Sequence, residues 1–150
     1  HNGANVVIAI GNPTVRHSVV QKYDGYVTFP NLIHPSVRIF DPSSVAFGRG
    51  NIVAADCIFT VNIQTGDFNY FNLGVTIGHD ATIGSYNVFN SYASISGNVK
   101  IGNRNLIGLK SSILQGIHID NDITVGLNSA VVRHLRHEGT YLGVPAKKIL

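Results

Sequence analysis

Apolar residues recur at every sixth position through most of the second half of the chain. The uninterrupted series is Ile77, Ile83, Phe89, Ile95, Ile101, Ile107, Ile113, Ile119, Val125 and Val131. An α-helix of 3.6 residues per turn would place positions six apart on different faces, so this period argues against a helix. It predicts short strands that each direct one apolar side chain toward a shared interior.

The residues between these apolar positions are suited to turns. Glycine follows the apolar residue at Gly78, Gly84, Gly102, Gly108 and Gly126. The fifth position of each six is small, amide or β-branched: Ala81, Asn87, Ala93, Val99, Asn105, Ser111, Ile117, Ile123 and Ser129. Glycine and asparagine accept turn conformations. Three such strands would close a triangular coil, and coils would stack at roughly 4.8 Å through parallel backbone hydrogen bonds. The fold class predicted is all-β, a parallel β-helix of between five and six coils.

The period changes phase in the first half of the repeat. Ile33, Ile39 and Val45 are six residues apart, Ile52 and Ile58 follow one residue out of step, and residue 71 restores the later phase. We interpret each step as one added residue at a bulged corner or loop. The segment 64–70, QTGDFNY, is predicted to be such a loop.

The two ends of the chain depart from the period. The run 6–10, VVIAI, predicts a buried strand, residues 11–13 predict a turn, and Val15, Val19, Val20 and Tyr23 recur at helical spacing. We therefore divide the chain into residues 1–31, a small α/β piece, and residues 32–150, the β-helix.

At the far end, Tyr141, Leu142 and Val144 are predicted to cap the open coil. Such a cap would protect a parallel edge that would otherwise invite pairing with further strands.

Composition limits the partners and the compartment. Charged residues make up 13% of the chain, with 16 glycines, a formal net charge of +3 and a pI near 9.2. This mild positive charge favours an anionic small molecule, and no basic cluster with interleaved aromatic residues indicates nucleic acid. No apolar run approaches the roughly 20 residues that cross a bilayer, and no signal peptide is recognisable. The lone Cys57 requires no oxidising compartment and is predicted to be a free buried thiol. We expect a cytoplasmic protein without membrane contact.

His79 and Asp80 separate two Thr-Ile-Gly triplets in the segment 76–84, TIGHDATIG. An imidazole can accept a proton at neutral pH, and a nearby carboxylate can orient the ring and favour the imidazolium that forms. The alternative is a surface histidine beside a turn aspartate. The residues alone leave both interpretations open.

Five segments together resemble the bacterial sugar acetyltransferases of the NeuD type. They are the hexapeptides, IAIGN at 8–12, the His-Asp pair in TIGHDATIG, SGNVKIG at 96–102 and LGVPAKKI at 142–149. That family includes sialic acid O-acetyltransferases and N-acetyltransferases of nucleotide-linked 4-amino sugars. The resemblance covers nearly the whole chain and implies a left-handed β-helix.

The resemblance also implies acetyl-CoA as the donor, a homotrimer with active sites between neighbouring β-helices, and a sugar or nucleotide-sugar acceptor. It implies that His79 is the catalytic base and that Asp80 tunes it. No metal is expected, and because acetyl-CoA is already activated, no covalent enzyme intermediate is required. The N-terminal 1–31 piece would be a remnant of a sugar-nucleotide-binding subdomain.

Further residues carry over from the family by position. The resemblance places Asn72 near the reacting groups. Gly11 and Asn12 form a turn before a helix, which could bind an anion of the acceptor or serve only a structural role. The resemblance assigns donor binding to Gly97, whose backbone N–H would also stabilise the oxyanion, and to Leu109, Gly126, Leu127 and Lys147 or its neighbour Lys148.

Two departures from the family pattern concern both substrates. Val88 stands where some members have a second histidine that contacts acetyl-CoA, so donor contacts are expected to differ. The family's N-terminal domain begins with a Gly-rich strand-turn-helix, and this sequence starts after it. If the 150 residues are the complete molecule, the acceptor pocket is expected to be truncated. The choice between amine and hydroxyl acceptors, and the sugar itself, stays open.

Two other functions remain as alternatives. Zinc carbonic anhydrases also use hexapeptide coils, but they need three histidine ligands, and His118 has no partner at Ile123 while His134 and His137 lie past the repeat. A non-catalytic β-helix serving as a spacer or a partner-binding surface is the second alternative. It predicts no affinity for CoA and tolerance of His79→Ala.

Overall fold

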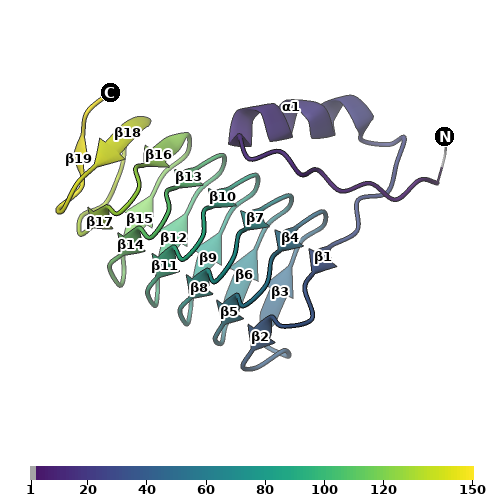
Figure 1. The fold of residues 1–150 in the computed structure, drawn as a ribbon, viewed down its shortest axis with the longest axis horizontal. Helices are drawn as coiled ribbons and strands as arrows, with labels where there is room; N and C mark the ends of the chain where they lie inside the picture. Colours follow the sequence, from purple (N-terminus) through teal and green to yellow (C-terminus); the bar gives the residue numbers. More distant parts are fainter. Residues whose placement is uncertain (1–2) are drawn as a thin grey trace.

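The computed structural model describes residues 3–150, which form a three-faced parallel β-helix with one α-helix beside it (Figure 1). Face 1 contains β1 (Leu32–Ile33), β4 (Ile52–Val53), β7 (Tyr70–Phe71), β10 (Val88–Phe89), β13 (Leu106–Ile107), β16 (Ile123–Val125), β18 (Gly139–Leu142) and β19 (Lys147–Lys148). Face 2 contains β2 (Arg38–Ile39), β5 (Ile58–Phe59), β8 (Thr76–Ile77), β11 (Ser94–Ile95), β14 (Ser112–Ile113) and β17 (Ala130–Val131). Face 3 contains β3 (Val45–Phe47), β6 (Ile63–Thr65), β9 (Thr82–Ile83), β12 (Lys100–Ile101) and β15 (His118–Ile119).

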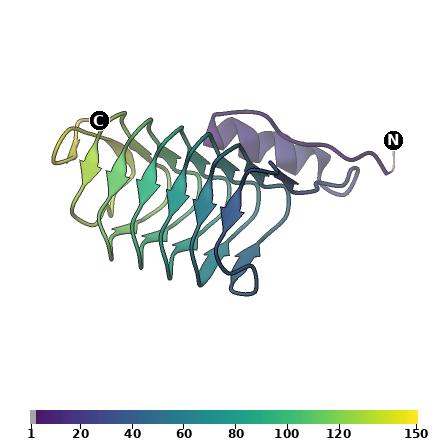
Figure 2. The same ribbon diagram turned by 60° about the horizontal axis from the view of Figure 1, so that its bottom comes forward.

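The coils stack in a constant register along most of the β-helix (Figure 2). Phe89 pairs with Phe71 on one side and with Ile107 on the other, so partners are 18 residues apart. Every pairing between named strands is parallel except the one between β18 and β19, which is antiparallel. The six-residue period and the stacked triangular coils predicted from the sequence are confirmed.

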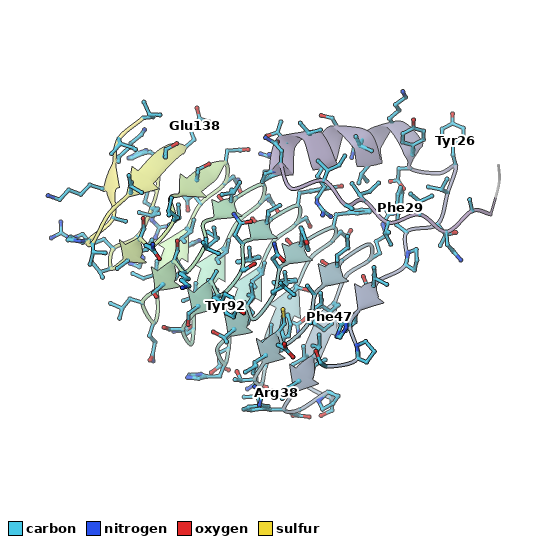
Figure 3. All side chains as sticks on the ribbon, in the orientation of Figure 1. Tyr26, Phe29, Arg38, Phe47, Tyr92 and Glu138 are labelled. Atoms are coloured by element: carbon cyan, nitrogen blue, oxygen red, sulfur yellow. The ribbon has the colours of Figure 1, made fainter. Side chains whose placement is uncertain are left out.

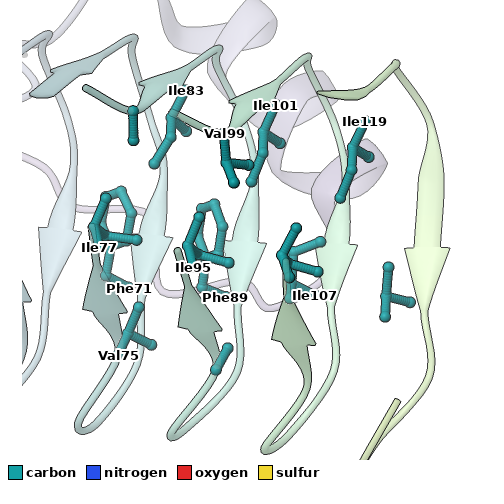
Figure 4. Close-up of a cluster of buried hydrophobic side chains, with 14 of the residues drawn as sticks. Phe71, Val75, Ile77, Ile83, Phe89, Ile95, Val99, Ile101, Ile107 and Ile119 are labelled. Carbon is teal, nitrogen blue, oxygen red and sulfur yellow. The ribbon is translucent and has the colours of Figure 1, made fainter. Parts of the chain in front are cut away.

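The interior is filled from two positions of each six-residue unit. The ten apolar residues of the main series are all buried, and several of them stack along the axis (Figure 4). The small, amide or β-branched fifth positions are buried as well. Phe47, Phe59, Phe71 and Phe89 form an aromatic column with ring centroids 4.9 to 5.1 Å apart. Polar chemistry is therefore confined to the corners and to the outward-facing positions of the strands.

The predicted phase changes are wrong in position. Val53 and Phe59 point inward while Ile52 and Ile58 are less buried, so the inward series continues without a break into the later one. Neighbouring apolar residues concealed this phase in the sequence.

The irregularity lies instead in the first coil. Arg38 pairs with Ile58 but Val45 pairs with Ile63, so the corner between β2 and β3 carries two extra residues. The predicted loop at 64–70 is an ordinary corner between β6 and β7, and its Phe68 and Asn69 are buried.

The N-terminal segment is partly as predicted. The helix α1 (Pro13–Tyr23) is confirmed, and Asn12 caps it by accepting the Val15 N–H at 3.0 Å. The predicted strand at 6–10 is wrong, because this segment is extended with no strand partner beyond a bridge between Asn5 and Thr28. Residues 1 and 2 of the predicted 1–31 unit lie outside the described chain, and that boundary stays a prediction.

Helix α1 lies along the corner between faces 3 and 1 and attaches there through Arg16, which the periodicity did not identify as buried. Its guanidinium is fully buried and donates to the carbonyls of Ile10 and Phe68, and it lies 5.5 Å from the Tyr70 ring centroid. Burial lowers the pKa of Arg16 to about 10, which still leaves it charged at neutral pH. Figure 3 shows Phe29, which packs edge-on against Phe68, beneath the same segment.

The C-terminal cap is confirmed in part. Tyr141 is buried on the last coil and donates its hydroxyl to the carbonyl of His137 at 2.8 Å. Leu142 is half-exposed and Val144 is 77% exposed, so Val144 covers no part of the coil in the described chain. Cys57 is a buried free thiol as predicted, and burial raises its pKa to about 11.

A ladder of buried asparagines runs along the corner between faces 3 and 1. Asn51, Asn69, Asn87 and Asn105 are each fully buried, and each side-chain oxygen accepts the backbone N–H of the residue 18 positions later, at 2.8 to 2.9 Å. Buried amide groups are costly unless they are paired, so this ladder fixes which coil residue stacks on which.

We expect Asn87→Leu to lower the free energy of unfolding by about 2 to 4 kcal/mol, because it leaves the buried Asn105 N–H and the partly buried Gly102 carbonyl without these partners. Urea unfolding followed by circular dichroism measures this change. The matched control is Asn103→Ala, which removes the same kind of hydrogen bond, to Ser85 N–H, at a less buried position and should cost about 1 kcal/mol or less. Equal losses in the two variants would contradict the ladder's role.

Candidate active site

The β-helix has three corners, and the predicted site residues occupy all of them. His79, Asp80 and Gly97 lie between faces 2 and 3, at what we call the His79 corner, formed by residues 78–81 and 96–99. Asn72, Leu109, Gly126 and Leu127 lie between faces 1 and 2, at what we call the Leu109 corner. Gly11 and Asn12 lie beside the third corner, where α1 packs. The first two groups therefore lie along opposite edges of face 2. Gly11 and Asn12 lie at neither of these edges.

His79 and Asp80 form a hydrogen-bonded pair. His79 Nδ1 lies 2.7 Å from Asp80 Oδ2, and both side chains are about half exposed. An ionised carboxylate only accepts hydrogen bonds, so Nδ1 carries the hydrogen and the lone pair of the neutral ring is on Nε2. Nε2 makes no hydrogen bond within residues 3–150. The ring is therefore oriented with a free basic nitrogen.

Asp80 is both a turn residue and a partner of His79. Its φ of 58° places it in the left-handed region, which aspartate tolerates. The hydrogen bond from His79 and then that from Asn62 Nδ2, at 3.1 Å, lower the pKa of its carboxyl group below the usual range. Asp80 accordingly stays ionised at neutral pH, and protonation would begin only at a pH below that of an ordinary aspartate.

Gly97 lies directly against the His79 ring, one coil further along. A Cβ atom added to Gly97 would collide with Nε2 and Cε1 of His79. The absence of a side chain at Gly97 therefore makes room for the imidazole ring. The Gly97 N–H donates no hydrogen bond within residues 3–150, which leaves a backbone donor free next to Nε2.

The Leu109 corner gathers the predicted donor-binding residues. Leu109 and Leu127 are exposed, and their N–H groups make no hydrogen bond within the described chain. Gly126 stacks on Gly108, and a Cβ added to Gly126 would collide with Leu142. Lys147 lies on β19 and pairs with Leu142, which connects it to this corner, and both Lys147 and Lys148 are exposed.

Asn72 is at the same corner, next to β7. Its side-chain oxygen accepts the Leu73 N–H at 2.8 Å, and its backbone carbonyl accepts from Cys57 Sγ at 3.1 Å. The strand β8 separates Asn72 from His79 within one chain.

Gly11 and Asn12 are not at the His79 corner. The side-chain oxygen of Asn12 caps α1 and is engaged. Asn12, Thr14, Arg104 and Asp122 line a cavity of about 150 Å³ at the third corner. Arg104 and Asp122 pair there through two hydrogen bonds of 2.6 and 2.7 Å, which raises the pKa of Arg104.

The other histidines among residues 3–150 do not form a metal site. His118 N–H donates to His134 Nδ1 at 3.0 Å, and Arg136 lies between His118 and Asp120. Among residues 3–150, no group of three histidine, cysteine, aspartate or glutamate side chains could hold a metal ion. The zinc alternative therefore has no ligand set in this part of the chain.

The larger cavities lie away from His79. One of about 480 Å³ is lined by Asp24, Tyr26 and Arg49 among others, and one of about 500 Å³ adjoins Leu32 and Leu73. Neither includes His79 or Asp80, whose side chains stand on an open surface.

None of the helices in residues 3–150 has the length and apolarity to span a membrane.

Sequence reasoning missed Asn62, which donates to Asp80. Once the coil length of 18 is known, Asn62 is found one coil before Asp80 on the same column, so the signal was present but needed the register. The register in turn was hidden by the misread phase at residues 52 and 58.

Comparison with known proteins supports the fold and the enzyme class. Neither a scan against protein-family models nor a search of curated proteins found a match. Among solved structures, PerB from Caulobacter crescentus, in complex with CoA and GDP-perosamine, is 30% identical over 97% of this chain and 69% of its own, with a TM-score of 0.92. WeeI from Acinetobacter baumannii AYE is 27% identical over 99% and 72%, with a TM-score of 0.94. The acetyltransferase domain of PglB from Neisseria gonorrhoeae FA1090 is 25% identical over 97% and 70%, with a TM-score of 0.92.

The fold and these structural matches define an acyltransferase built on a left-handed parallel β-helix. Within that class, the chain belongs to the bacterial sugar acetyltransferases of the hexapeptide-repeat type. The family and the fold expected from the sequence are thereby confirmed.

We expect Gly97→Ala to reduce acyl transfer about tenfold or more, because the new methyl group displaces the His79 ring. Gly84→Ala is the matched control, since its Cβ would press on the Gly102 backbone at another corner. Rates should be compared per folded molecule, with the folded fraction taken from urea unfolding. Equal rates in the two variants would show that the ring position is unimportant.

Proposed function

We propose that the chain transfers an acetyl group from acetyl-CoA to an amino or hydroxyl group of a nucleotide-linked sugar, with His79 as the general base. The observation that carries the proposal is the His79–Asp80 pair, which leaves Nε2 basic and unengaged beside the free Gly97 N–H. PerB was solved with CoA and GDP-perosamine, and the PglB domain was also solved with acetyl-CoA. The lone thiol Cys57 fits a cytoplasmic setting, which is part of the proposal.

The residues divide the proposed chemistry between them. Nε2 of His79 takes the proton from the acceptor amine or hydroxyl as that group attacks the thioester carbon. Asp80 stabilises the imidazolium that forms, and the Gly97 N–H donates to the oxyanion of the tetrahedral intermediate. Collapse of the intermediate breaks the carbon–sulfur bond, and the CoA sulfur leaves as a thiolate that takes up a proton. No covalent enzyme intermediate is needed.

The Leu109 corner fits the donor as an extended molecule with amide groups. The free N–H groups of Leu109 and Leu127 can donate to carbonyls along the pantetheine arm of CoA. Lys147 and Lys148 supply exposed positive charge for its phosphates. We assign Asn72, Gly11 and Asn12 to the acceptor side, with Asn12 acting through its backbone because its side chain caps α1.

We also propose a homotrimer in which a neighbouring chain completes each site. In one chain the His79 corner and the Leu109 corner stand at opposite edges of face 2, and His79 lies on an open surface. Leu73, Tyr92, Leu109 and Leu127 are exposed along the Leu109 corner, and Figure 3 shows Tyr92 projecting from the coil. Packing the Leu109 corner of one chain beside the His79 corner of another would bury these side chains and join the two halves.

Replacing His79 by alanine tests the proposed base. We expect His79→Ala to lower acetyl transfer by about 10²-fold or more. Free-thiol release from acetyl-CoA, measured over a panel of nucleotide amino sugars and sialic acids, gives the rate and identifies the acceptor. The matched control is His118→Ala, an exposed coil histidine bonded to Arg136, which should keep the wild-type rate. Equal rates in wild type and His79→Ala would exclude His79 as the base.

Sedimentation equilibrium tests the assembly. At micromolar concentration we expect a mass about three times the 16.1 kDa of one chain. Apolar area buried at the interfaces should hold the trimer together. A monomer under these conditions would remove the proposed site between subunits, because each chain would then hold only half of it.

A further inference from the structure

The carboxylate of Asp80 has a second partner besides His79. Asn62 donates from Nδ2 to Asp80 Oδ1 at 3.1 Å, while Asp80 Oδ2 pairs with His79 Nδ1 at 2.7 Å. Both Asp80 oxygens are thus engaged, one by each neighbour. A carboxylate held at both oxygens cannot rotate away from the imidazole without losing a hydrogen bond.

The amide of Asn62 must point its nitrogen at Asp80, because an amide oxygen facing a carboxylate would repel it. The backbone that carries this amide is itself fixed. Asn62 N–H donates to Ser44 Oγ at 3.0 Å, and the next residue, Ile63, donates to the Ser44 carbonyl at 3.1 Å. Hydrogen bonds thus connect Ser44 to Asn62, Asn62 to Asp80, and Asp80 to His79. Ser44, Asn62 and Asp80 occupy equivalent positions of successive coils, in one column at the corner between faces 2 and 3.

Turn geometry alone does not require this amide. Asn62, Asp80, Asn98 and Gly116 occupy the same column with φ values of 55°, 58°, 54° and 73°. Glycine and aspartate are therefore both accepted there by the backbone. Of the two asparagines, only Asn62 has a side-chain hydrogen bond to another residue within residues 3–150.

We propose that Asn62 is a positioning residue for the general base: by holding Asp80, it keeps the His79 ring in the Nδ1–H tautomer that leaves Nε2 free to accept a proton. This inference rests on the proposed function and deepens it. The hydrogen bond from Asn62 also contributes to the lowered pKa of Asp80, in agreement with the geometry. The Asn62 amide acts through Asp80 and is not assigned a contact with substrate.

The first variant is Asn62→Gly, which removes the amide and keeps a residue suited to φ near +55°. We expect kcat to fall about three- to tenfold, with the KM for acetyl-CoA unchanged, because a hydrogen bond to a half-exposed charged group is lost. In ¹⁵N NMR spectra at pH 8, the fraction of neutral His79 carrying its proton on Nδ1 should also decrease. This tautomer measurement needs no turnover.

Two further variants separate positioning from shape. Asp56→Gly also removes a side chain at a corner with positive φ (62°), between β4 and β5, and should leave kcat and the tautomer at wild-type values. Asn62→Asp keeps the shape but replaces the donor with a second carboxylate facing Asp80. It should reduce kcat and the Nδ1–H fraction at least as much as Asn62→Gly. Matching urea midpoints for Asn62→Gly and Asp56→Gly would exclude unfolding as the cause.

The results decide the role as follows. If Asn62→Gly keeps both the wild-type tautomer and kcat, or if Asn62→Asp behaves as wild type, Asn62 is a corner residue and the proposal is wrong. A changed tautomer with unchanged kcat, in a protein that depends on His79, would also overturn it. If His79→Ala retains activity, the proposed function fails, and the tautomer alone then decides whether Asn62 positions the ring.

Discussion

The 18-residue register between successive coils is the constraint on which the rest of the molecule depends. It is enforced twice, by parallel backbone pairing on three faces and by the buried asparagine ladder, in which each amide oxygen accepts the N–H of the residue one coil later. A slip of one residue would turn apolar side chains outward and leave buried amides without partners. Because both penalties act at every coil, the chain has one stacking arrangement and every corner residue has fixed neighbours.

That register creates the candidate site from residues far apart in sequence. His79 lies against Gly97 and Asp80 lies above Asn62 because each pair is separated by one coil. The site is therefore a column of corner residues and not a local motif. Its polar groups sit on a rigid core of stacked isoleucines and phenylalanines, which suits a base that must hold one orientation.

Strict periodicity predicted the coil and its period correctly, whereas the catalytic role of His79 and Asp80 rests on family resemblance and stays a prediction. The predicted phase was wrong at residues 52 and 53, where either of two adjacent apolar residues could have filled the interior. The predicted strand was wrong at 6–10, where the apolar run has no strand partner within residues 3–150. Sequence reasoning also missed the buried Arg16, because its stabilisation comes from carbonyls of residues distant in sequence. Asn62 was missed because its partner Asp80 lies one coil later, so the pair is recognised only when the register between coils is known. The assignment of donor and acceptor residues rests on family resemblance and stays a prediction.

The corner between β2 and β3 has a consequence for how such a scaffold varies. It holds two extra residues, yet the strands on either side pair in register with the next coil and the core is undisturbed. A corner can thus lengthen at the cost of a few exposed residues, whereas a strand cannot change length without displacing all coils beyond it. Phe40, 64% exposed, is carried on this enlarged corner, on the same edge of the molecule as His79. Diversity in a repeating solenoid is therefore expected to accumulate at its edges, next to the chemistry, while its faces stay uniform.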